Sequence, residues 1–471
     1  MKRLLLVALA AAALTALVAA PAAAGPPGKW TRITGVGGIP AANTDEIGLE
    51  RTNNGVLHVA WTRETASGNN QLLHSALSAN AQNVAGPHPI IALSDALNNS
   101  VDLVAGSGGG LRVLFAGLFP ASPLDRVLSS ATSGPAGTSW SAASPISNTS
   151  SGGSSPVYAG AGIAGVLGGP GFDFVGAWGD SGPGDGGFHI GIDPADPDFH
   201  FPNSCCSIDP GVGVDSQTGQ FMVARNDSST TVSRIRVTRV GGSTVSAPNS
   251  GASTTQQRIS ISGRIGKPGV FVAYGRGTNQ FLGRPAWWRV GAPEFHFFKG
   301  REGAENVGLA PAPGGRLWLF WEFENRIEAV RTGTDAVSVG GIRRIKLPNG
   351  TDDVSGIFGE GSRGRLDILV LADPASGLGY FHQHIKPGLR VLADPQKVKR
   401  GGNVVFTVTD GDPVAGAVVR IQFGTNVIKG TTNGAGKVTL HIPGNAALGK
   451  RKAVAKKPGY ARGVRRFVIL N

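Results

Sequence analysis

The stretch Leu317-Trp318-Leu319-Phe320-Trp321, which follows the turn Pro313-Gly314-Gly315, is a short apolar strand that ends in aromatic residues. The same combination of a turn and an apolar strand recurs along the chain. Its seven occurrences are residues 56–61, 111–115, 174–178, 221–224, 270–274, 317–321 and 366–371. Six intervals separate Trp61 from Leu371, so the mean period is about 52 residues. A period of this length predicts an array of similar β units.

A second, shorter strand precedes each apolar strand and begins with a pair of polar residues. The pairs are Asp45-Glu46, Asn98-Asn99, Ser154-Ser155, Cys205-Cys206, Gln256-Gln257, Glu305-Asn306 and Asp352-Asp353. Small residues follow the pairs, as in Ala159-Gly160-Ala161-Gly162, and two further strands follow each apolar strand. Strands of small residues suit close packing around a central axis. We therefore predict an all-β fold in which residues 25–387 form a seven-bladed β-propeller, with six or eight blades as alternatives.

The last unit lacks an obvious fourth strand of its own. After residues 366–372 and 379–382 the chain turns basic, whereas residues 30–34, before the first unit, have the pattern of an outer strand. Joining residues 30–34 to the last unit closes the ring and leaves no sheet edge exposed. We therefore expect the two ends of the propeller to meet in one blade.

The composition favours many short strands, and the N-terminus favours export. Glycine accounts for 72 of the 471 residues and charged residues for 16%, which argues against a mainly helical protein and against a disordered polyelectrolyte. Residues 1–24 combine the basic start Met1-Lys2-Arg3, an apolar core and the small residues Ala22-Ala23-Ala24. This pattern is typical of a cleaved signal peptide. We expect a protein that is secreted or associated with the cell wall or envelope, and no transmembrane segment.

The chain has two cysteines, and they are neighbours, Cys205 and Cys206. A larger disulfide framework and a zinc or haem site both lack partner residues. Three alternatives remain for the pair: two free thiols, links to another chain, or a disulfide between neighbours. For an oxidising compartment we predict a strained vicinal disulfide near the mouth of the propeller channel. We expect no cofactor and no metal.

Residues 388–471 differ from the rest of the chain in charge and pattern. They carry fifteen Lys and Arg against three Asp, whereas residues 25–387 are almost neutral. Short strands separated by turns, such as residues 404–409 and 417–423, predict a small antiparallel β-sandwich. Residues 413–419 and 431–437 resemble the immunoglobulin-like modules of bacterial surface and secreted proteins. The resemblance implies an immunoglobulin-like domain over residues 388–471.

The positive charge of this segment is densest near its end. The cluster comprises Lys450, Arg451, Lys452, Lys456, Lys457, Arg465 and Arg466. Such clusters attract polyanions through the summed field and the release of counterions. We predict attachment to an anionic cell-wall polymer or another polyanion; the alternative is a solvated surface that keeps the domain soluble.

The stretch Ser130-Ala131-Thr132-Ser133-Gly134, with Thr138-Ser139-Trp140, resembles the Asp-box turn of sialidase-like propellers. Thr132 stands where that turn carries an aspartate, and Gly38-Ile39-Pro40 lacks the arginine of the family's Arg-Ile-Pro signature. The resemblance implies a sialidase-like propeller fold and assigns no catalytic residue in this chain.

Loops at the ends of the predicted strands bring polar residues to the propeller axis. The candidate ligand-binding residues are Asp45, Arg63, Asp180, Arg225, Asp227, Arg276, Glu322, Asp352 and Asp353. A ring of carboxylates and arginines suits a polyhydroxylated ligand; alternatively, these residues satisfy backbone groups in turns. We predict a binding protein that recognises a carbohydrate or an extracellular protein. The alternative is a sialidase-like glycoside hydrolase, which needs two carboxylates ~5–9 Å apart.

Overall fold

The structure is a computed structural model, and part of the chain is described in it. The described residues are 22–23, 29–34, 47–64, 70–78, 83–93, 101–106, 109–118, 126–145, 158–164, 175–180, 187–191, 199–202, 210–227, 234–250, 259–276, 283–374 and 377–471. All structural statements below concern these residues. They form strands and turns, and none of them belongs to a helix that could cross a membrane.

Seven antiparallel sheets of at least four strands follow one another along the described chain. In order from the innermost strand they are β3 (Gly48–Arg51), β4 (Leu57–Glu64), β5 (Asn70–Leu77) and β6 (Asn83–Leu93); β7 (Val101–Ala105), β8 (Leu111–Leu118), β9 (Arg126–Ser133) and β10 (Ser144–Pro145); β11 (Tyr158–Ala164), β12 (Val175–Asp180), β13 (Gly187–Gly191) and β14 (Phe199–Pro202); β15 (Gly211–Val214), β16 (Phe221–Asp227), β17 (Arg234–Arg239) and β18 (Thr244–Ser246); β19 (Ser260–Arg264), β20 (Lys267–Arg276), β21 (Arg284–Arg289) and β22 (Phe295–Phe297); β23 (Glu305–Ala312), β24 (Arg316–Glu322), β25 (Arg326–Arg331) and β26 (Arg343–Lys346); and β27 (Gly356–Glu360), β28 (Leu366–Ala372), β29 (Gly379–Ile385) and β2 (Thr31–Arg32).

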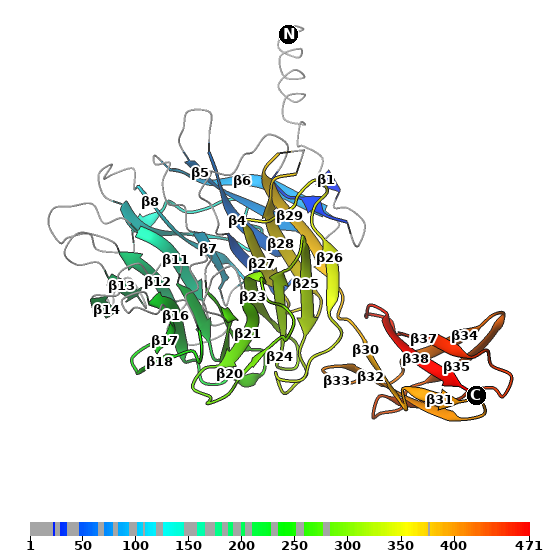
Figure 1. The fold of residues 1–471 in the computed structure, drawn as a ribbon. Coiled ribbons are helices and arrows are strands. Elements are labelled where there is room, and N and C mark those ends of the chain that lie inside the picture. Colours follow the sequence, from blue (N-terminus) through cyan, green and yellow to red (C-terminus); the bar gives the residue numbers. More distant parts are fainter. Residues whose placement is uncertain are drawn as a thin grey trace, which may run out of the picture.

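The first strands of these sheets form a ring. Each contacts the first strand of the next sheet, from β3 through β7, β11, β15, β19 and β23 to β27, and β27 contacts β3 (Figure 1). The chain is therefore a β-propeller.

Glycines allow the inner strands to approach one another closely. A Cβ atom on Gly211 of β15 would lie 1.9 Å from the carbonyl oxygen of Ile259, and one on Gly263 of β19 would lie 1.8 Å from the carbonyl oxygen of Val214. No side chain fits at these distances, because they are far below van der Waals contact. The small residues of the inner strands are thus required by the packing at the axis.

The second strand of a sheet supplies the bulky core between neighbouring sheets. In β24, Trp318 and Phe320 pack with residues of β27 and β28, whereas Trp321 packs with residues of β20 and β21. All three aromatic side chains are almost fully buried. Successive side chains of a strand point to opposite faces, so one apolar stretch stabilises the contacts with both neighbouring sheets.

The short strand β2 forms the outer edge of the last sheet. Thr31 pairs with His382 and Arg32 with Phe381 of β29, and the amide of Ile33 donates to the carbonyl of Tyr380 at 2.9 Å. The side chain of Ile33 is buried, and the indole of Trp30 donates to the carbonyl of Lys346 at 2.8 Å. This is the position that the sequence analysis assigns to residues 30–34.

A further two-residue strand, β1 (Ala22–Ala23), adds a fifth strand to the first sheet by pairing with β6. It lies within the segment that the sequence analysis assigns to the signal peptide. A chain that begins at Gly25 would lack this pairing.

The C-terminal segment forms a second unit of two sheets. One sheet contains β30 (Arg390–Asp394), β32 (Asn403–Asp410), β33 (Asp412–Pro413) and β36 (Lys437–His441). The other contains, in spatial order, β31 (Lys397–Lys399), β38 (Gly463–Leu470), β37 (Gly449–Lys456), β34 (Val418–Phe423) and β35 (Asn426–Thr431). Phe406 and Phe467 meet edge-on between the sheets, with ring centroids 5.6 Å apart. This unit is a β-sandwich, which we call the C-terminal sandwich.

Two ion pairs join the propeller to the C-terminal sandwich. Arg331 donates to Asp410, and both side chains are buried. Arg316 donates to Asp412 at 2.7 Å, and Asp412 also accepts from the amide of Thr334 at 2.9 Å. Removing one partner of a buried ion pair leaves an uncompensated charge, at a cost of about 3–5 kcal/mol. The pair of Arg331 and Asp410 therefore strongly favours the docked arrangement.

A pair of buried histidines lies in the first sheet. The Nδ1 atom of His58 is 3.0 Å from Nε2 of His74, and Nε2 of His58 is 3.1 Å from the hydroxyl of Thr52. Burial, reinforced by the positive charge of Arg51, lowers the pKa of His58 to about 4. Burial, reinforced by His58 and His88, lowers the pKa of His74 to about 3. Both rings are therefore neutral at ordinary pH.

The docking of β2 gives a first prediction. Replacing Ile33 by Ala removes buried apolar contacts between β2 and the last sheet, so the free energy of unfolding should fall by about 2–5 kcal/mol. Urea unfolding measures the change, with Lys29→Ala as the control because Lys29 is exposed beside the same strand. Equal stability of the two variants would show that this strand does not close the ring.

The histidine pair gives a second prediction. Each ring has a folded-state pKa below its unfolded value of about 6.5, so its contribution to stability is complete above that pH and is lost as the pH falls toward 4. The slope approaches ~1.4 kcal/mol per pH unit for each ring. NMR titration of the imidazole resonances should find both rings uncharged at pH 5; either ring titrating near 6.5 contradicts the expectation.

Candidate functional site

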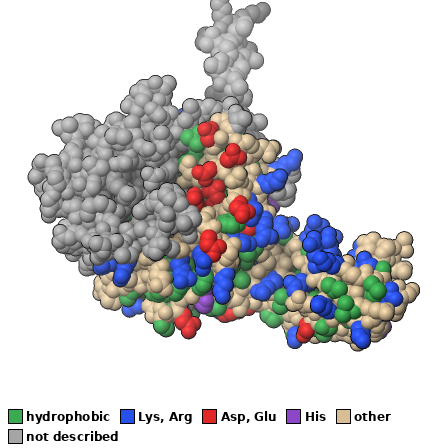
Figure 2. All heavy atoms as spheres, viewed as in Figure 1, with side chains coloured by type: hydrophobic (Ala, Val, Ile, Leu, Met, Phe, Trp, Pro, Cys, Tyr) green, Lys and Arg blue, Asp and Glu red, His purple; other side chains and the backbone are tan. Residues whose placement is uncertain are grey.

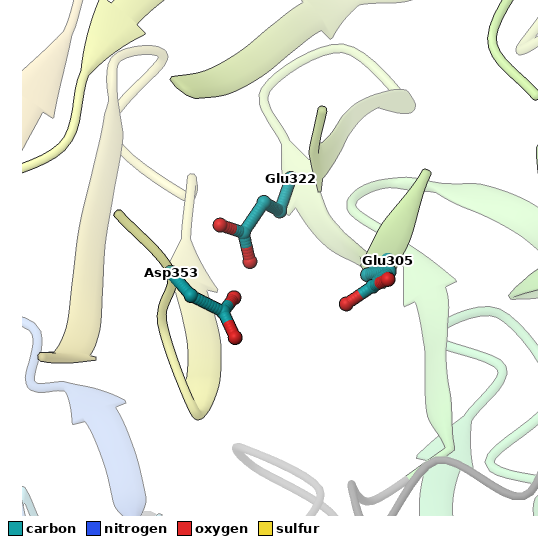
Figure 3. A group of neighbouring side chains, drawn as sticks. All are labelled: Glu305, Glu322 and Asp353. Carbon is teal, nitrogen blue, oxygen red and sulfur yellow. The ribbon is translucent and has the colours of Figure 1, made fainter. Parts of the chain in front are cut away.

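Three carboxylates meet at the end of the propeller where the inner strands begin. One oxygen atom from each of Glu305, Glu322 and Asp353 lies within 4.8 Å of the others, and the three side chains point toward a common space (Figure 3). Glu322 is buried, Glu305 is half-buried and Asp353 is exposed. We call these three residues the carboxylate cluster.

The strand order of two adjacent sheets positions the cluster. Glu305 begins β23 and pairs with Glu322, which ends β24. Asp353 precedes β27 of the next sheet and accepts from the amide of Val354 at 2.8 Å. The side-chain amide of Asn306 donates to Glu322 at 3.0 Å and to the carbonyl of Val354 at 2.8 Å. Asn306 therefore links the two sheets and fixes the orientation of Glu322.

Burial among other carboxylates changes the protonation of the cluster. Burial raises the pKa of Glu322 to about 8, and the negative charge of Asp353 and a hydrogen bond to it act in the same direction. Burial and the charge of Asp353 also raise the pKa of Glu305. At neutral pH Glu322 thus holds a proton and can donate a hydrogen bond, while carboxylate oxygens beside it accept. Three converging carboxylates also have the chemistry of a site for a divalent cation, which requires Glu322 to ionise.

The predicted site residues are only partly brought together. Glu322 and Asp353 meet in the cluster, and Asp352 is exposed beside them. Arg63 donates to the side chain of Gln71 at 2.8 Å, on the neighbouring strand of its own sheet. Arg225 is buried on β16.

Arg276 lies in a different environment from the cluster. Its guanidinium is 4.5 Å from the ring centroid of Phe297 and 5.1 Å from that of Phe295, both on β22, the outermost strand of its sheet. Such stacking of a cation on aromatic faces is a packing interaction. Arg276 therefore contributes to the rim of the propeller.

Other predicted residues lie outside the description. Asp45, Cys205 and Cys206 lie outside the described residues, and the side chains of Asp180 and Asp227, which end β12 and β16, are outside them too. The vicinal disulfide stays a prediction.

Two members of the arrangement are absent from the predicted site, Glu305 and Asn306. The sequence contains the pattern that identifies them, because Glu305-Asn306 and Asp352-Asp353 are both polar pairs before an inner strand. Inner strands of adjacent blades run in the same direction, so such pairs lie at the same end. Extending the prediction from one pair to the next therefore finds Glu305.

A second polar network lies at the opposite ends of the inner strands. Arg51, which ends β3, is buried and donates to Glu360 of β27 and to Asp367 of β28. Asp367 also accepts from His382 at 2.9 Å. Burial, together with repulsion by Glu360, raises the pKa of Glu50 to about 8. Because Arg51 neutralises two carboxylates here, we interpret this network as structural.

The predicted basic cluster is divided by the fold of the C-terminal sandwich. Lys450, Lys452, Lys456 and Arg466 are exposed, whereas Arg465 is half-buried. Arg451 donates to the carbonyls of Ala447 and Leu448, and Lys457 donates to the carbonyl of Ala415 at 2.7 Å. Figure 2 shows acidic side chains on the visible face of the propeller and Lys and Arg side chains over the sandwich.

Comparisons with known proteins give a fold and no function. No family model and no curated protein matches the chain. Among solved structures, the BP39L lectin from Burkholderia pseudomallei aligns with 85% of this chain and 99% of its own, at 14% identity and a TM-score of 0.49. YCF48 from Cyanidioschyzon merolae aligns with 76% of this chain and 98% of its own, at 13% identity and a TM-score of 0.41. Similarity at this level says nothing of what the chain binds.

The protonation of Glu322 gives a third prediction. Its folded-state pKa is raised from 4.5 to about 8, so its contribution to stability is complete below pH 4.5 and is lost as the pH rises to 8. Glu322→Gln keeps the neutral form at every pH. Without divalent cations, the variant should therefore lose less stability than the unsubstituted protein between pH 5 and 8, by up to ~1.4 kcal/mol per pH unit.

Urea unfolding at both pH values measures this difference. Glu294→Gln is the control, because Glu294 is exposed in the turn before β22. The interpretation fails if Glu322→Gln retains the full pH dependence.

Proposed function

We propose that the protein is a secreted or envelope-associated protein that binds a carbohydrate through the carboxylate cluster of a seven-bladed propeller. The propeller comprises residues 25–387, after removal of the signal peptide 1–24. An immunoglobulin-like domain, residues 388–471, attaches the protein to an anionic partner in the envelope. The seven described sheets and the charge of the C-terminal sandwich support this organisation.

The observation that carries the binding proposal is the mixed protonation of the cluster. A sugar hydroxyl both donates and accepts, so its recognition needs groups of both kinds. Protonated Glu322 supplies a donor, and Asp353 supplies exposed acceptor oxygens within 4.8 Å of it. Glu305, half-buried on the next segment, supplies a third oxygen facing the same space.

A glycoside hydrolase is the second candidate, and the same pair of residues favours it. A retaining glycosidase uses a protonated carboxyl as general acid and an ionised one as nucleophile, with about 5–5.5 Å between them. Glu322, with its pKa raised to about 8, has the character of the acid, and Asp353 is in the place of the nucleophile. Hydrolysis and binding therefore predict different effects for one substitution.

A glycan array followed by calorimetry and product analysis tests both candidates. For binding, Asp353→Asn should weaken the affinity about tenfold or more, because a charge-assisted hydrogen bond is lost. Glu322→Gln should retain binding, because the amide is also a neutral donor. For hydrolysis, Glu322→Gln should abolish product formation, because the amide has no proton to transfer.

Glu294→Gln serves as the control and should match the unsubstituted protein in both assays. Loss of all binding on addition of a chelator, together with loss in Glu322→Gln, would identify the cluster as a cation site instead. Binding that is indifferent to both Asp353→Asn and Glu322→Gln would refute the proposal.

A further inference from the structure

One face of the C-terminal sandwich concentrates positive charge. In the sheet β31–β38–β37–β34–β35, residues with buried side chains alternate with exposed ones. On β37 the exposed side includes Lys450, Lys452 and Lys456, and Lys452 pairs directly with Arg466 of β38. We call this exposed side of the five-stranded sheet the basic face.

Strands on both flanks extend the same charge. Arg420 of β34 and Lys429 of β35 form a cross-strand pair on this side. On the other flank, Lys397 and Lys399 of β31 are exposed and pair with Val468 and Leu470 of β38. None of the five strands contains Asp or Glu. The basic face thus presents eight cations and no strand carboxylate to oppose them.

The opposite face of the sandwich has a different character. Its exposed residues on β30 and β36 include Arg390 and Lys437, together with the carboxylate of Asp394. The remaining two acids of this segment, Asp410 and Asp412, are paired with propeller arginines. Positive charge is therefore gathered on one face, which a general requirement for solubility does not explain.

Apolar side chains stand among the cations of the basic face. Val418, Val427, Val464 and Leu470 are 41%, 39%, 49% and 42% exposed, respectively. They are half of the eight large apolar side chains that are exposed in the described part of the chain, so their position on one sheet needs an explanation. Exposed apolar groups on one surface mark a contact with another molecule.

We propose that the basic face docks on an anionic lipid surface, with its cations at the headgroups and its apolar side chains at the boundary of the acyl chains. This inference rests on the attachment to an anionic partner proposed above, and names the partner. Each Lys or Arg near such a surface contributes about 1 kcal/mol, and the contribution is screened by salt. Apolar burial adds a part that salt does not screen.

Two observations favour lipid over a soluble polyanion or a nucleic acid. A soluble polyanion gains from the cations alone and leaves the four apolar side chains exposed. Single-stranded nucleic acid binds through aromatic side chains on which bases stack. The aromatic residues of these strands are Phe423, which packs against the sandwich core, and Phe467, which is buried in it. The basic face therefore offers no stacking surface.

Sedimentation of the full-length protein with vesicles tests the proposal. The vesicles contain phosphatidylcholine alone or mixed with phosphatidylglycerol, and polyphosphate bound to beads is the soluble-polyanion probe. The double variant Lys452→Glu/Arg466→Glu should bind the mixed vesicles at least about tenfold more weakly. The control Arg390→Glu/Lys437→Glu makes the same change of charge on the opposite face and should bind within about twofold of the unsubstituted protein.

A second double variant, Val464→Ser/Leu470→Ser, tests the apolar contribution. At high salt it should lose the remaining vesicle binding while keeping its binding to polyphosphate at low salt. Circular dichroism and thermal melting of each variant verify that the sandwich remains folded.

The outcomes separate this inference from the proposed function. Binding to polyphosphate without binding to mixed vesicles overturns the lipid inference and leaves the attachment to a polyanion in place. Binding to neither probe overturns both. Equal losses in the two charge-reversed variants also overturn the inference, because they show that net charge rather than the basic face governs binding. None of these outcomes bears on carbohydrate binding by the propeller.

Discussion

The close approach of the inner strands around the axis is the constraint on which the rest of the propeller depends. At Gly211 and Gly263 a neighbouring carbonyl oxygen occupies the space of a side chain. Because bulk is excluded there, the large apolar residues belong to the second strands, where they fill the wedge between neighbouring sheets. The ring of inner strands also has to close, and β27 in contact with β3 achieves it, with β2 completing the last sheet from the other end of the chain.

The same constraint creates the carboxylate cluster. Inner strands that run side by side in one direction bring their first residues together at one end of the channel. Glu305 and Asp353 belong to adjacent sheets and meet for this reason, while Glu322 arrives from the end of a second strand. Their proximity raises the proton affinity of Glu322, and Asn306 holds its carboxyl group in place. The polarity of the mouth thus follows from strand direction.

Much of the propeller could be predicted from the sequence, because its physical requirements are local and periodic. Apolar strands such as residues 317–321 and polar pairs such as Asp352-Asp353 recur at a regular interval, and this places them at equivalent positions of the sheets. The fate of a long side chain cannot be predicted in this way. Arg276 stacks on the rings of a strand nearly twenty residues later, and Lys457 reaches a carbonyl of another turn.

The basic face shows the same limit. The run Lys450-Arg451-Lys452 appears uniform in the sequence, but the alternation of a strand sends Arg451 to a different side from its neighbours. Lys397 and Lys399, distant in sequence, join the face through the parallel pairing of β31 with β38. Strand register decides which charges act together, and register depends on contacts across the whole sheet.

The joint between the propeller and the C-terminal sandwich also sorts charge between the two units. Asp410 and Asp412 are two of the three acidic residues in a strongly basic segment, and both are matched by arginines of the propeller. Separation of the units would return two carboxylates to the sandwich and two guanidinium groups to the propeller, making the one less cationic and the other more so. Docking therefore works as an internal neutralisation that sharpens the electrical contrast between an acidic mouth and a basic base.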